Sequence, residues 1–385
     1  MLRVSADRLV PAAPAELAAL LAHERPADGP VRRLCAAGDV GFSGRLAALA
    51  GGHDPFREIA WVVRGADLAF ANLETPLVGE DPGGRLFAAS TRAAALLAGA
   101  GFRLVNLANN HVLDYGPEGL ASTLDALAAA GVGTLGAGDG ARELVVTELD
   151  GLRVGWLGCA RTLQPSSRFW EYDPAALTAA VRDASPRVDV LIVSVHMGYM
   201  YVDVPHPAQR RHVLELLGAG ADLVLLHHPH VLQGVEVAPG GGVACYSLGN
   251  LLLDWREGEV AVDQMVEEQR TGGLFLIDLD RRGVCRLAVL PLRVDDGWVV
   301  RWARGDAGRM ILDRLERTSD CVDVDALFHR QLAERATGLA FRTALGEIRR
   351  GRLKGVLALL RRLRRHHLRM VLGWLGARFK GRPGR

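Results

Sequence analysis

Three histidines occur within four residues of this chain: His227, His228 and His230. They directly follow the apolar run Ala221–Leu226, which is typical of a buried strand. Pro229 prevents a helix from continuing that strand. Imidazoles at the end of a buried strand are costly without partners, and ligands of open α/β sheets bind at the carboxyl ends of strands. Since an extended His-x-His pair points both rings to one side, the stretch predicts either two metal ligands or two hydrogen-bonded loop histidines.

Other apolar runs end in the same way, with polar side chains suited to chemistry. These ends are Asp39 after the run 31–37, Asn72 and Glu74 after 67–71, Asn109, Asn110 and His111 after 102–108, and His196 after 188–195. Taken alone, Asp39 is better explained as the N-cap of a following helix. Chance rarely places such residues repeatedly at one edge of a sheet, so we predict that they converge on one concave site.

Six of these side chains form a candidate metal centre: Asp39, Glu74, Asn110, His196, His228 and His230. Two carboxylates, one amide and three imidazoles can hold two divalent ions about 3.5–4 Å apart, with one carboxylate as a bridge. Glu74 is the predicted bridge. Mixed nitrogen and oxygen ligands suit Mn, Fe or Zn rather than Ca or Mg.

The remaining polar groups at the strand ends are candidates for catalysis and substrate binding. His111 is predicted to stand near the ions as a proton donor for a leaving oxygen, with Asp114 available to orient it. The candidate substrate-binding residues are Asn72, Asn109, Tyr199, His227 and Asn250.

An alternation of strands and helices must position these residues, which indicates an α/β domain from residue 31 to about 305. Helices are predicted at 54–65, 91–99, 117–130, 174–184 and 209–218, a hairpin at 145–159, and closing strands of a second sheet at 272–280 and 284–292. Residues 1–30 form a leader, in which 14–23 is predicted to be a short amphipathic helix with proline at its start.

The cysteines and the hydropathy pattern bear on location. The five cysteines are scattered and odd in number, which argues against a disulfide framework and for a reducing compartment. Charged residues and prolines interrupt the N-terminus, so no signal peptide is indicated. No run reaches the about 18 apolar residues that a membrane-spanning helix needs. These features predict a cytoplasmic protein, with peripheral attachment to the inner membrane face as an option.

Residues 306–385 are predicted to be a helical extension that ends in a basic amphipathic tail. The segment 342–385 contains 12 Arg, 2 Lys and 1 Glu, a net charge of +13, so the rest of the chain carries −11 of the total +2. Such a tail suits an anionic membrane surface. Packing on the acidic body and binding an anionic polymer are the alternatives. The sequence does not favour nucleic acid as a partner, because only two aromatic residues, Trp374 and Phe379, lie among these charges.

The strand ends also match known motifs in order, from about residue 32 to 293. The matching motifs are Gly38-Asp39, Asn72–Pro76, Asn106–His111 with Asp114–Gly116, Gly136–Gly138, Ser194–Gly198, Gly220–Asp222, His227–Val231 and Tyr246–Asn250. In these motifs the chain resembles the capsule-synthesis CapA family (PGA-cap proteins) of the calcineurin-like metallophosphoesterases. The resemblance implies a four-layer α/β/β/α metallophosphoesterase-like sandwich, followed here by the helical extension, with the six predicted ligands in the family's metal motifs.

The sequence departs from the family pattern at four points. Gly41 stands where the first phosphoesterase motif has a histidine, Met197 and Met200 replace a tryptophan and a glutamate, and Leu226 replaces a glycine. The usual N-terminal membrane anchor is also missing from the sequence.

The resemblance implies a role in the synthesis of a capsule or another anionic polymer such as poly-γ-glutamate. Two functions stay open. One is a metal-dependent hydrolase or transferase acting on a phosphoester or a peptide-like polymer bond. The other is a non-catalytic accessory or scaffold protein for assembly or export of the polymer.

Overall fold

The computed structural model describes residues 1–10, 13, 17–42, 52–79, 87–163, 166–253, 267–320 and 324–334. Its contacts divide the chain into two compact units, Met1–Cys321 and Val322–Arg385. In the second unit the described residues form one helix at 324–334. The predicted basic tail lies outside the described residues. None of the helices that are described is long and apolar enough to cross a membrane.

A ten-stranded sheet forms the larger part of the first unit, with the main path β1-β2-β15-β14-β3-β4-β5-β6 and with β13 beside β3 and β16 beside β15. Its strands are β1 (Leu2–Ser5), β2 (Ala18–Glu24), β3 (Arg32–Gly41), β4 (Leu68–Leu73), β5 (Leu104–Asn106), β6 (Gly133–Leu135), β13 (Asn250–Leu253), β14 (Thr271–Asp280), β15 (Gly283–Val294) and β16 (Val300–Trp302). β3, β4, β5 and β6 run parallel, so their carboxyl ends meet at one edge.

A six-stranded sheet has the order β11-β12-β10-β9-β8-β7. Its strands are β7 (Val145–Leu149), β8 (Leu152–Ala160), β9 (Val190–His196), β10 (Leu223–His227), β11 (Leu232–Val237) and β12 (Val243–Leu248). β8, β9, β10 and β12 are parallel. The predicted hairpin is β7 and β8, which pair antiparallel and turn at Asp150 and Gly151, both with positive φ.

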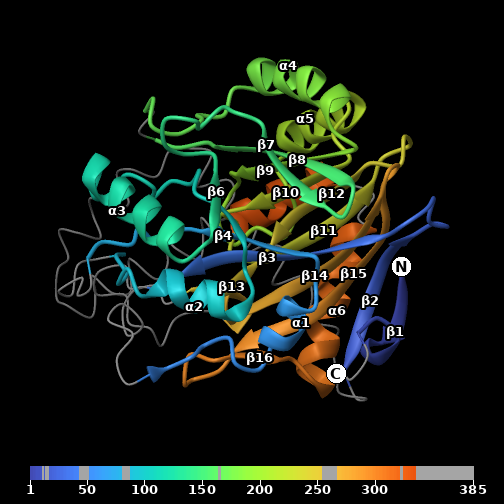
Figure 1. Cartoon of the computed structure of the whole chain (residues 1–385). Coiled ribbons are helices and arrows are strands. Elements are labelled where there is room, and N and C mark those ends of the chain that lie inside the picture. Colours follow the sequence, from blue (N-terminus) through green and yellow to red (C-terminus); the bar gives the residue numbers. More distant parts are fainter. Residues whose placement is uncertain are drawn as a thin grey trace, which may run out of the picture. The chain divides into compact units, whose positions relative to one another are not determined.

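Helices cover the outer faces of the two sheets. They are α1 (Ala60–Arg64), α2 (Ala93–Ala100), α3 (Gly116–Ala129), α4 (Pro174–Ala184) and α5 (Pro207–Gly218). A further helix, α6 (Gly305–Ser319), instead packs Ile311, Leu312 and Leu315 into the core between the sheets. α4 and α5 lie together over the smaller sheet, and α1 and α2 lie on the other side of the molecule, against the larger sheet (Figure 1). α4 begins where Asp173 accepts a hydrogen bond from Ala176 N and Pro174 occupies the first turn.

The core between the sheets joins the two inner layers. Phe70 of β4 stacks on Trp156 of β8, with ring centroids 5.0 Å apart, and Trp156 is fully buried. Separate apolar clusters lie between each sheet and its own helices. The expected four-layer α/β/β/α sandwich is therefore confirmed.

The N-terminal residues differ from their prediction. Ala18–Glu24 is a strand, β2, which pairs antiparallel with β1 and β15 instead of forming a helix. Its alanines and leucines have good helix propensity, but pairing with the edge of the large sheet overrides that weak preference. The leader is thus part of the sandwich.

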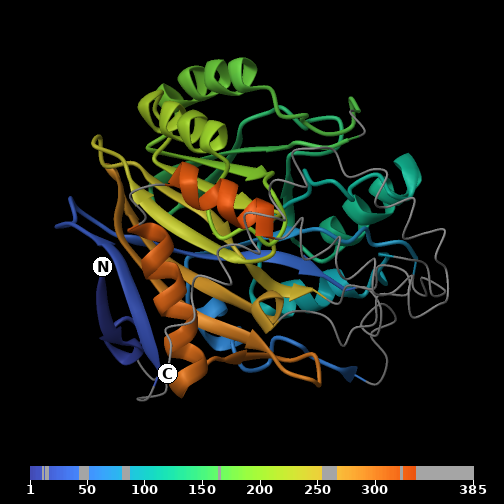
Figure 2. The same ribbon diagram turned by 180° about the vertical axis from the view of Figure 1, so that it is seen from behind.

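Two assignments near the end of the first unit also need correction. β14 pairs with β3, so the runs predicted to close the second sheet extend the large sheet instead. α6, placed beyond the predicted boundary at 305, packs against β11, β2 and β15. Figure 2 shows it beside β1 and β2, and Arg3 Nη2 lies 2.7 Å from Asp313 Oδ1 of this helix. The first compact unit therefore continues to Cys321.

Candidate metal centre

The carboxyl ends of both sheets bring the predicted residues together. In the large sheet Asp39 on β3 lies opposite Asn72 on β4, which lies opposite Asn106 on β5. In the small sheet His196 on β9 lies opposite His227 on β10. Parallel pairing carries the end of each strand to the same edge, so residues far apart in the chain become neighbours.

Four donor atoms face one another at the centre of the site. His196 Nε2 lies 2.7 Å from Asn110 Oδ1, 3.1 Å from His228 Nδ1 and 3.6 Å from Glu74 Oε1. His230 Nε2 lies 3.8 Å from the same Glu74 oxygen. All six predicted metal ligands thus lie in one cluster, because Asp39 Oδ2 is 3.3 Å from His230 Nδ1.

Asp39 sits behind this cluster, fully buried among hydrogen-bond donors. Asn72 Nδ2 donates to its Oδ1 at 2.8 Å, and the backbone N–H of His228 donates to its Oδ2 at 3.1 Å. The Asn72 amide is also 3.1 Å from His196 Nδ1, and Asn106 Nδ2 donates to Asn72 Oδ1 at 2.9 Å. These bonds tie together the ends of β3, β4, β5 and β9 and the turn after β10.

The two histidines of the His-x-His pair have unusual backbones. His228 has φ 97° and His230 has φ 56°, in the left-handed region that favours glycine. Such conformations cost about 1–3 kcal/mol for other residues and gather at functional sites. The bond from His228 N to Asp39 and the 3.0 Å contact of His230 Nδ1 with Asn250 Oδ1 hold this turn in place.

Charge and burial work against each other in the site. Burial alone would raise the pKa of Asp39, but the neighbouring imidazoles, His230 first, outweigh it and hold that pKa below its ordinary value. Burial raises the pKa of Glu74, with His230 opposing and Asp39 adding to the rise. Burial, with His230 adding, lowers the pKa of His228 to about 4. Burial would also lower the pKa of His230, yet Glu74 and Asp39 raise it to about 9. The two carboxylates therefore favour positive charge at His230.

The surroundings of Glu74 fit a bound cation. The side chain is 1% exposed, and neither carboxylate oxygen has a hydrogen-bond partner among the described residues. A buried carboxylate without partners is costly, and one donor atom each of Glu74, His228 and His230 lie within 4.8 Å of one another. Imidazole and carboxylate donors suit Mn, Fe or Zn.

His111 stands at the edge of this cluster. Its Nδ1 lies 2.7 Å from Asp114 Oδ2, as predicted for an oriented imidazole, and its ring lies 4.0 Å from the ring of Phe87. Its side chain is 19% exposed, so the ring can meet a molecule that approaches the cluster. Asn110 and His228 are also half-buried.

Four of the predicted substrate-binding residues are at most 2% exposed: Asn72, Asn109, His227 and Asn250. Asn109 donates to Leu73 O and accepts from His111 N. The His227 ring lies 6.0 Å from the ring of Phe70, on the core side of the site. Their burial contradicts direct substrate contact, because the core rather than solvent surrounds them. Asn72 and Asn250 instead position site residues through hydrogen bonds, and Asn109 positions His111.

The fifth, Tyr199, is 46% exposed and stacks on His206, with ring centroids 5.7 Å apart. Tyr201 is the tyrosine beside the cluster, with its ring 6.2 Å from that of His230. Tyr201 and Asn106 are site residues that the sequence analysis missed. Asn106 lies at a strand end inside a matched motif, which could have indicated it, whereas nothing in the sequence separates Tyr201 from Tyr199.

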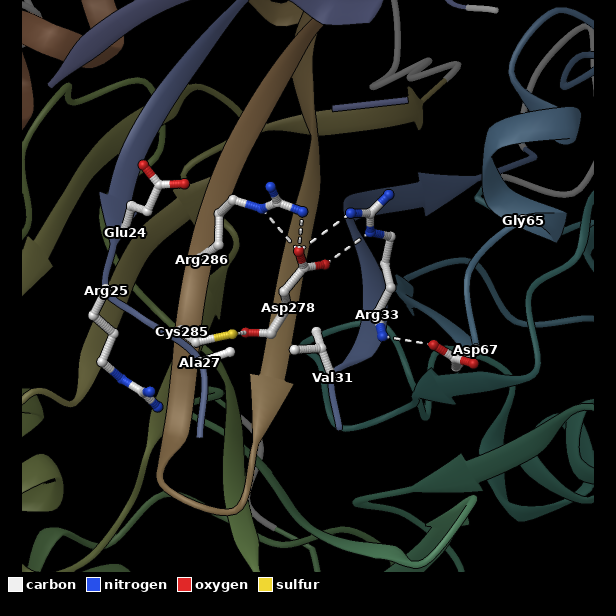
Figure 3. A pocket seen from close by; sticks show the side chains of 10 residues that line it. All are labelled: Glu24, Arg25, Ala27, Val31, Arg33, Gly65, Asp67, Asp278, Cys285 and Arg286. Atoms are coloured by element: carbon white, nitrogen blue, oxygen red, sulfur yellow. Dashed lines mark hydrogen bonds and ion pairs between the residues drawn. The ribbon is translucent and has the colours of Figure 1, made fainter. Parts of the chain in front are cut away.

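A cavity of about 450 Å³ lies away from this cluster, near the amino end of β3, and charged residues contribute much of its lining (Figure 3). Arg33 Nε donates to Asp278 Oδ1 and Arg286 Nε donates to Asp278 Oδ2, both at 2.8 Å. Arg25 pairs in the same way with Asp280. The arginines that line this cavity therefore already have carboxylate partners.

A four-layer sandwich with mixed imidazole and carboxylate donors at its strand ends is a metallophosphoesterase-like arrangement. The family model described as "Bacterial capsule synthesis protein PGA_cap" matches residues 33–255. The chain therefore belongs to the PGA_cap family, as its motifs indicated.

Relatives from two bacteria agree with this assignment. The chain is 29% identical to the capsule biosynthesis protein CapA of Bacillus anthracis over 265 residues, which are 63% of this chain and 62% of the relative. It is 30% identical to a probable polyglutamine synthesis accessory protein of Mycobacterium tuberculosis over 237 residues, 55% of this chain and 61% of the relative. The chain thus covers less than two thirds of these curated relatives.

Among solved structures, a phosphatase from Mycoplasma pneumoniae is similar at 14% identity and a TM-score of 0.47, covering 69% of this chain and 95% of the other.

Proposed function

We propose that this chain acts in the synthesis of an anionic polymer of the poly-γ-glutamate type, and that its strand-end site works with a divalent metal ion. The observation that carries the proposal is the Glu74 carboxylate, buried without a hydrogen bond among the described residues and faced by imidazole nitrogens. Membership of the PGA_cap family and the names of the relatives support this type of polymer.

Glu74, Asn110, His196, His228 and His230 would hold the ion. When bound, a divalent ion polarises a carbonyl or phosphoryl oxygen and lowers the pKa of a coordinated water. The proposed reaction is hydrolysis or group transfer at a peptide-like or phosphoester bond. Asn110, His111 and His228 are the half-buried side chains of the cluster, and a substrate would meet the site on their side.

His111 supplies the proton in this proposal. Asp114 lies at Nδ1, and a carboxylate there fixes the ring and favours a proton on that nitrogen. The opposite nitrogen, Nε2, is buried in this structure, so it would give a proton to a leaving oxygen or nitrogen from the protonated ring only after the groups that cover it move aside. A positioned acid of this kind contributes typically 10²–10⁴-fold to rate.

A non-catalytic accessory role is the second candidate. The absence of a side chain at Gly41 favours it, because the motif that usually supplies two ligands supplies one at most here. In that role the ion would stabilise the strand ends without turning over a substrate.

The test is activity of the full chain against poly-γ-glutamate and a phosphodiester, with Mn²⁺, Fe²⁺ or Zn²⁺ added and then removed by a chelator. The enzyme proposal expects turnover that the chelator abolishes and that His228→Ala lacks. His23→Ala is the matched control, because His23 contacts Val284 O at the opposite end of the large sheet. Metal-stabilised protein without turnover of either substrate would support the accessory role, and chelator-insensitive turnover would contradict both.

A further inference from the structure

We infer that the site is built for one metal ion and that protein fills the second position of the expected pair. This inference rests on the proposed metal dependence and concerns how the donors are shared. Sequence spacing alone predicted two ions with Glu74 as their bridge. The contacts instead gather most of the six side chains around one metal position and leave Asp39 apart from it.

One position collects most of the donors. The distances from His196 Nε2 to Asn110 Oδ1, His228 Nδ1 and Glu74 Oε1 are 2.7, 3.1 and 3.6 Å. Ligands about 2.0–2.2 Å from an ion lie roughly 3–3.5 Å apart when they are neighbours in its shell. These four atoms therefore suit a single shell, and His230 Nε2 faces the same Glu74 oxygen.

Asp39 lies on the wrong side of His230 for a second ion. It approaches Nδ1, at 3.3 Å, whereas Glu74 faces Nε2. The two ring nitrogens point in divergent directions, so one ion cannot use both carboxylates together with His230. A metal-binding histidine commonly donates its other N–H to a carboxylate, which fixes the ring. Asp39 is thus a positioning residue for His230.

The usual third ligand of a second ion has no room here. An ideal Cβ on Gly41, two residues after Asp39 on β3, would lie 2.4 Å from Leu253 Cδ1 and 2.5 Å from Thr75 Oγ1. β13, which contains Leu253, pairs with β3 at this point. An apolar side chain and a hydroxyl therefore occupy the space into which a ligand at 41 would extend.

The experiment is a Mn²⁺ titration of the metal-free full chain, with elemental analysis and electron paramagnetic resonance at saturation. We expect one ion per chain and the hyperfine spectrum of an isolated ion. Asp39→Asn should keep one ion with an affinity about 10–100-fold lower. His228→Ala should retain none at the same free Mn²⁺ concentration, and His23→Ala should match the parent.

Two ions per chain with a magnetically coupled spectrum would overturn the inference and leave the metal proposal standing, most clearly if Asp39→Asn removed one of them. No bound ion in the parent chain would overturn both. The parent stoichiometry decides the matter even if Asp39→Asn, a change at a fully buried residue, fails to fold.

Discussion

Gly41→Ala tests whether the edge of the site is closed. The added Cβ would lie about 1 Å nearer to Leu253 Cδ1 and Thr75 Oγ1 than ordinary contacts of 3.4–4 Å allow. Leu253 is 3% and Thr75 1% exposed, so neither side chain can swing into solvent. Overpacking of this kind costs typically about 1–3 kcal/mol. We expect the free energy of unfolding to fall by that amount.

Gly99→Ala is the matched control. Gly99 lies in α2, is exposed, and would have no atom within 4 Å of its added Cβ. There the same change should stabilise the chain by up to about 1 kcal/mol, because alanine favours a helix over glycine. Urea denaturation followed by circular dichroism, analysed with a common slope, gives both differences.

Leu253→Ala should cost less in the Gly41→Ala background than in the parent chain, since it removes one of the two clashing atoms. Contacting residues show coupling energies of about 0.5–3 kcal/mol in such a cycle. If Gly41→Ala is neutral or stabilising like its control, the position is open and the argument for a closed second metal position fails.

The remaining predictions concern catalysis, pH and the tail. His111→Ala should keep the bound metal and, if turnover is found, lose about 10²–10⁴-fold in kcat; loss of metal would make His111 a ligand instead. Burial alone would raise the pKa of Asp278, but its arginine partners outweigh burial and hold it below the ordinary value. That stabilisation is present above the unfolded pKa and is lost as pH falls toward the folded pKa, so Asp278→Asn should flatten the acid side of a stability profile and cost about 3 kcal/mol at neutral pH. The full chain should sediment with vesicles of anionic lipid, less at high salt, and a version ending at Phe341 should not; full-length protein that ignores the vesicles would favour a tail packed on the body.

Much of the site could be predicted because parallel strands deliver their carboxyl ends to one edge. Asp39, Glu74 and His196 needed only the recognition of a buried run and of the polar residue that ends it. Position 38 requires glycine because the backbone of β3 approaches that of Gly249 closely here. A Cβ at position 38 would lie 1.9 Å from Gly249 O, and the Asp39 N–H donates to that oxygen at 3.0 Å. Two matched motifs are therefore two sides of one contact.

The roles within the site could not be predicted, because they depend on direction. Strand spacing places Asp39 near His230 but does not say which ring nitrogen it meets. Asn72 and His227 stand at the ends of apolar runs in the sequence, where substrate contact was expected, yet pairing with neighbouring strands buries both. Tyr199 and Tyr201 differ by two residues, and the loop, with its positive φ at Tyr201, decides which of them approaches the cluster.

The helix predicted for residues 14–23 was wrong for a related reason. The segment Ala18–Glu24 has a composition that suits a helix, but its partner strands lie before it and more than 250 residues after it in the chain. Local propensity is weak beside such pairing. Nothing within residues 1–30 alone indicates the distant strand.

The most direct test of the central claim is an anomalous difference map from crystals of the full chain grown with Mn²⁺. The account predicts a single strong peak among Glu74 Oε1, His196 Nε2 and His228 Nδ1, with Asp39 outside the coordination shell. An empty map at these atoms, under conditions that saturate binding in solution, would contradict it.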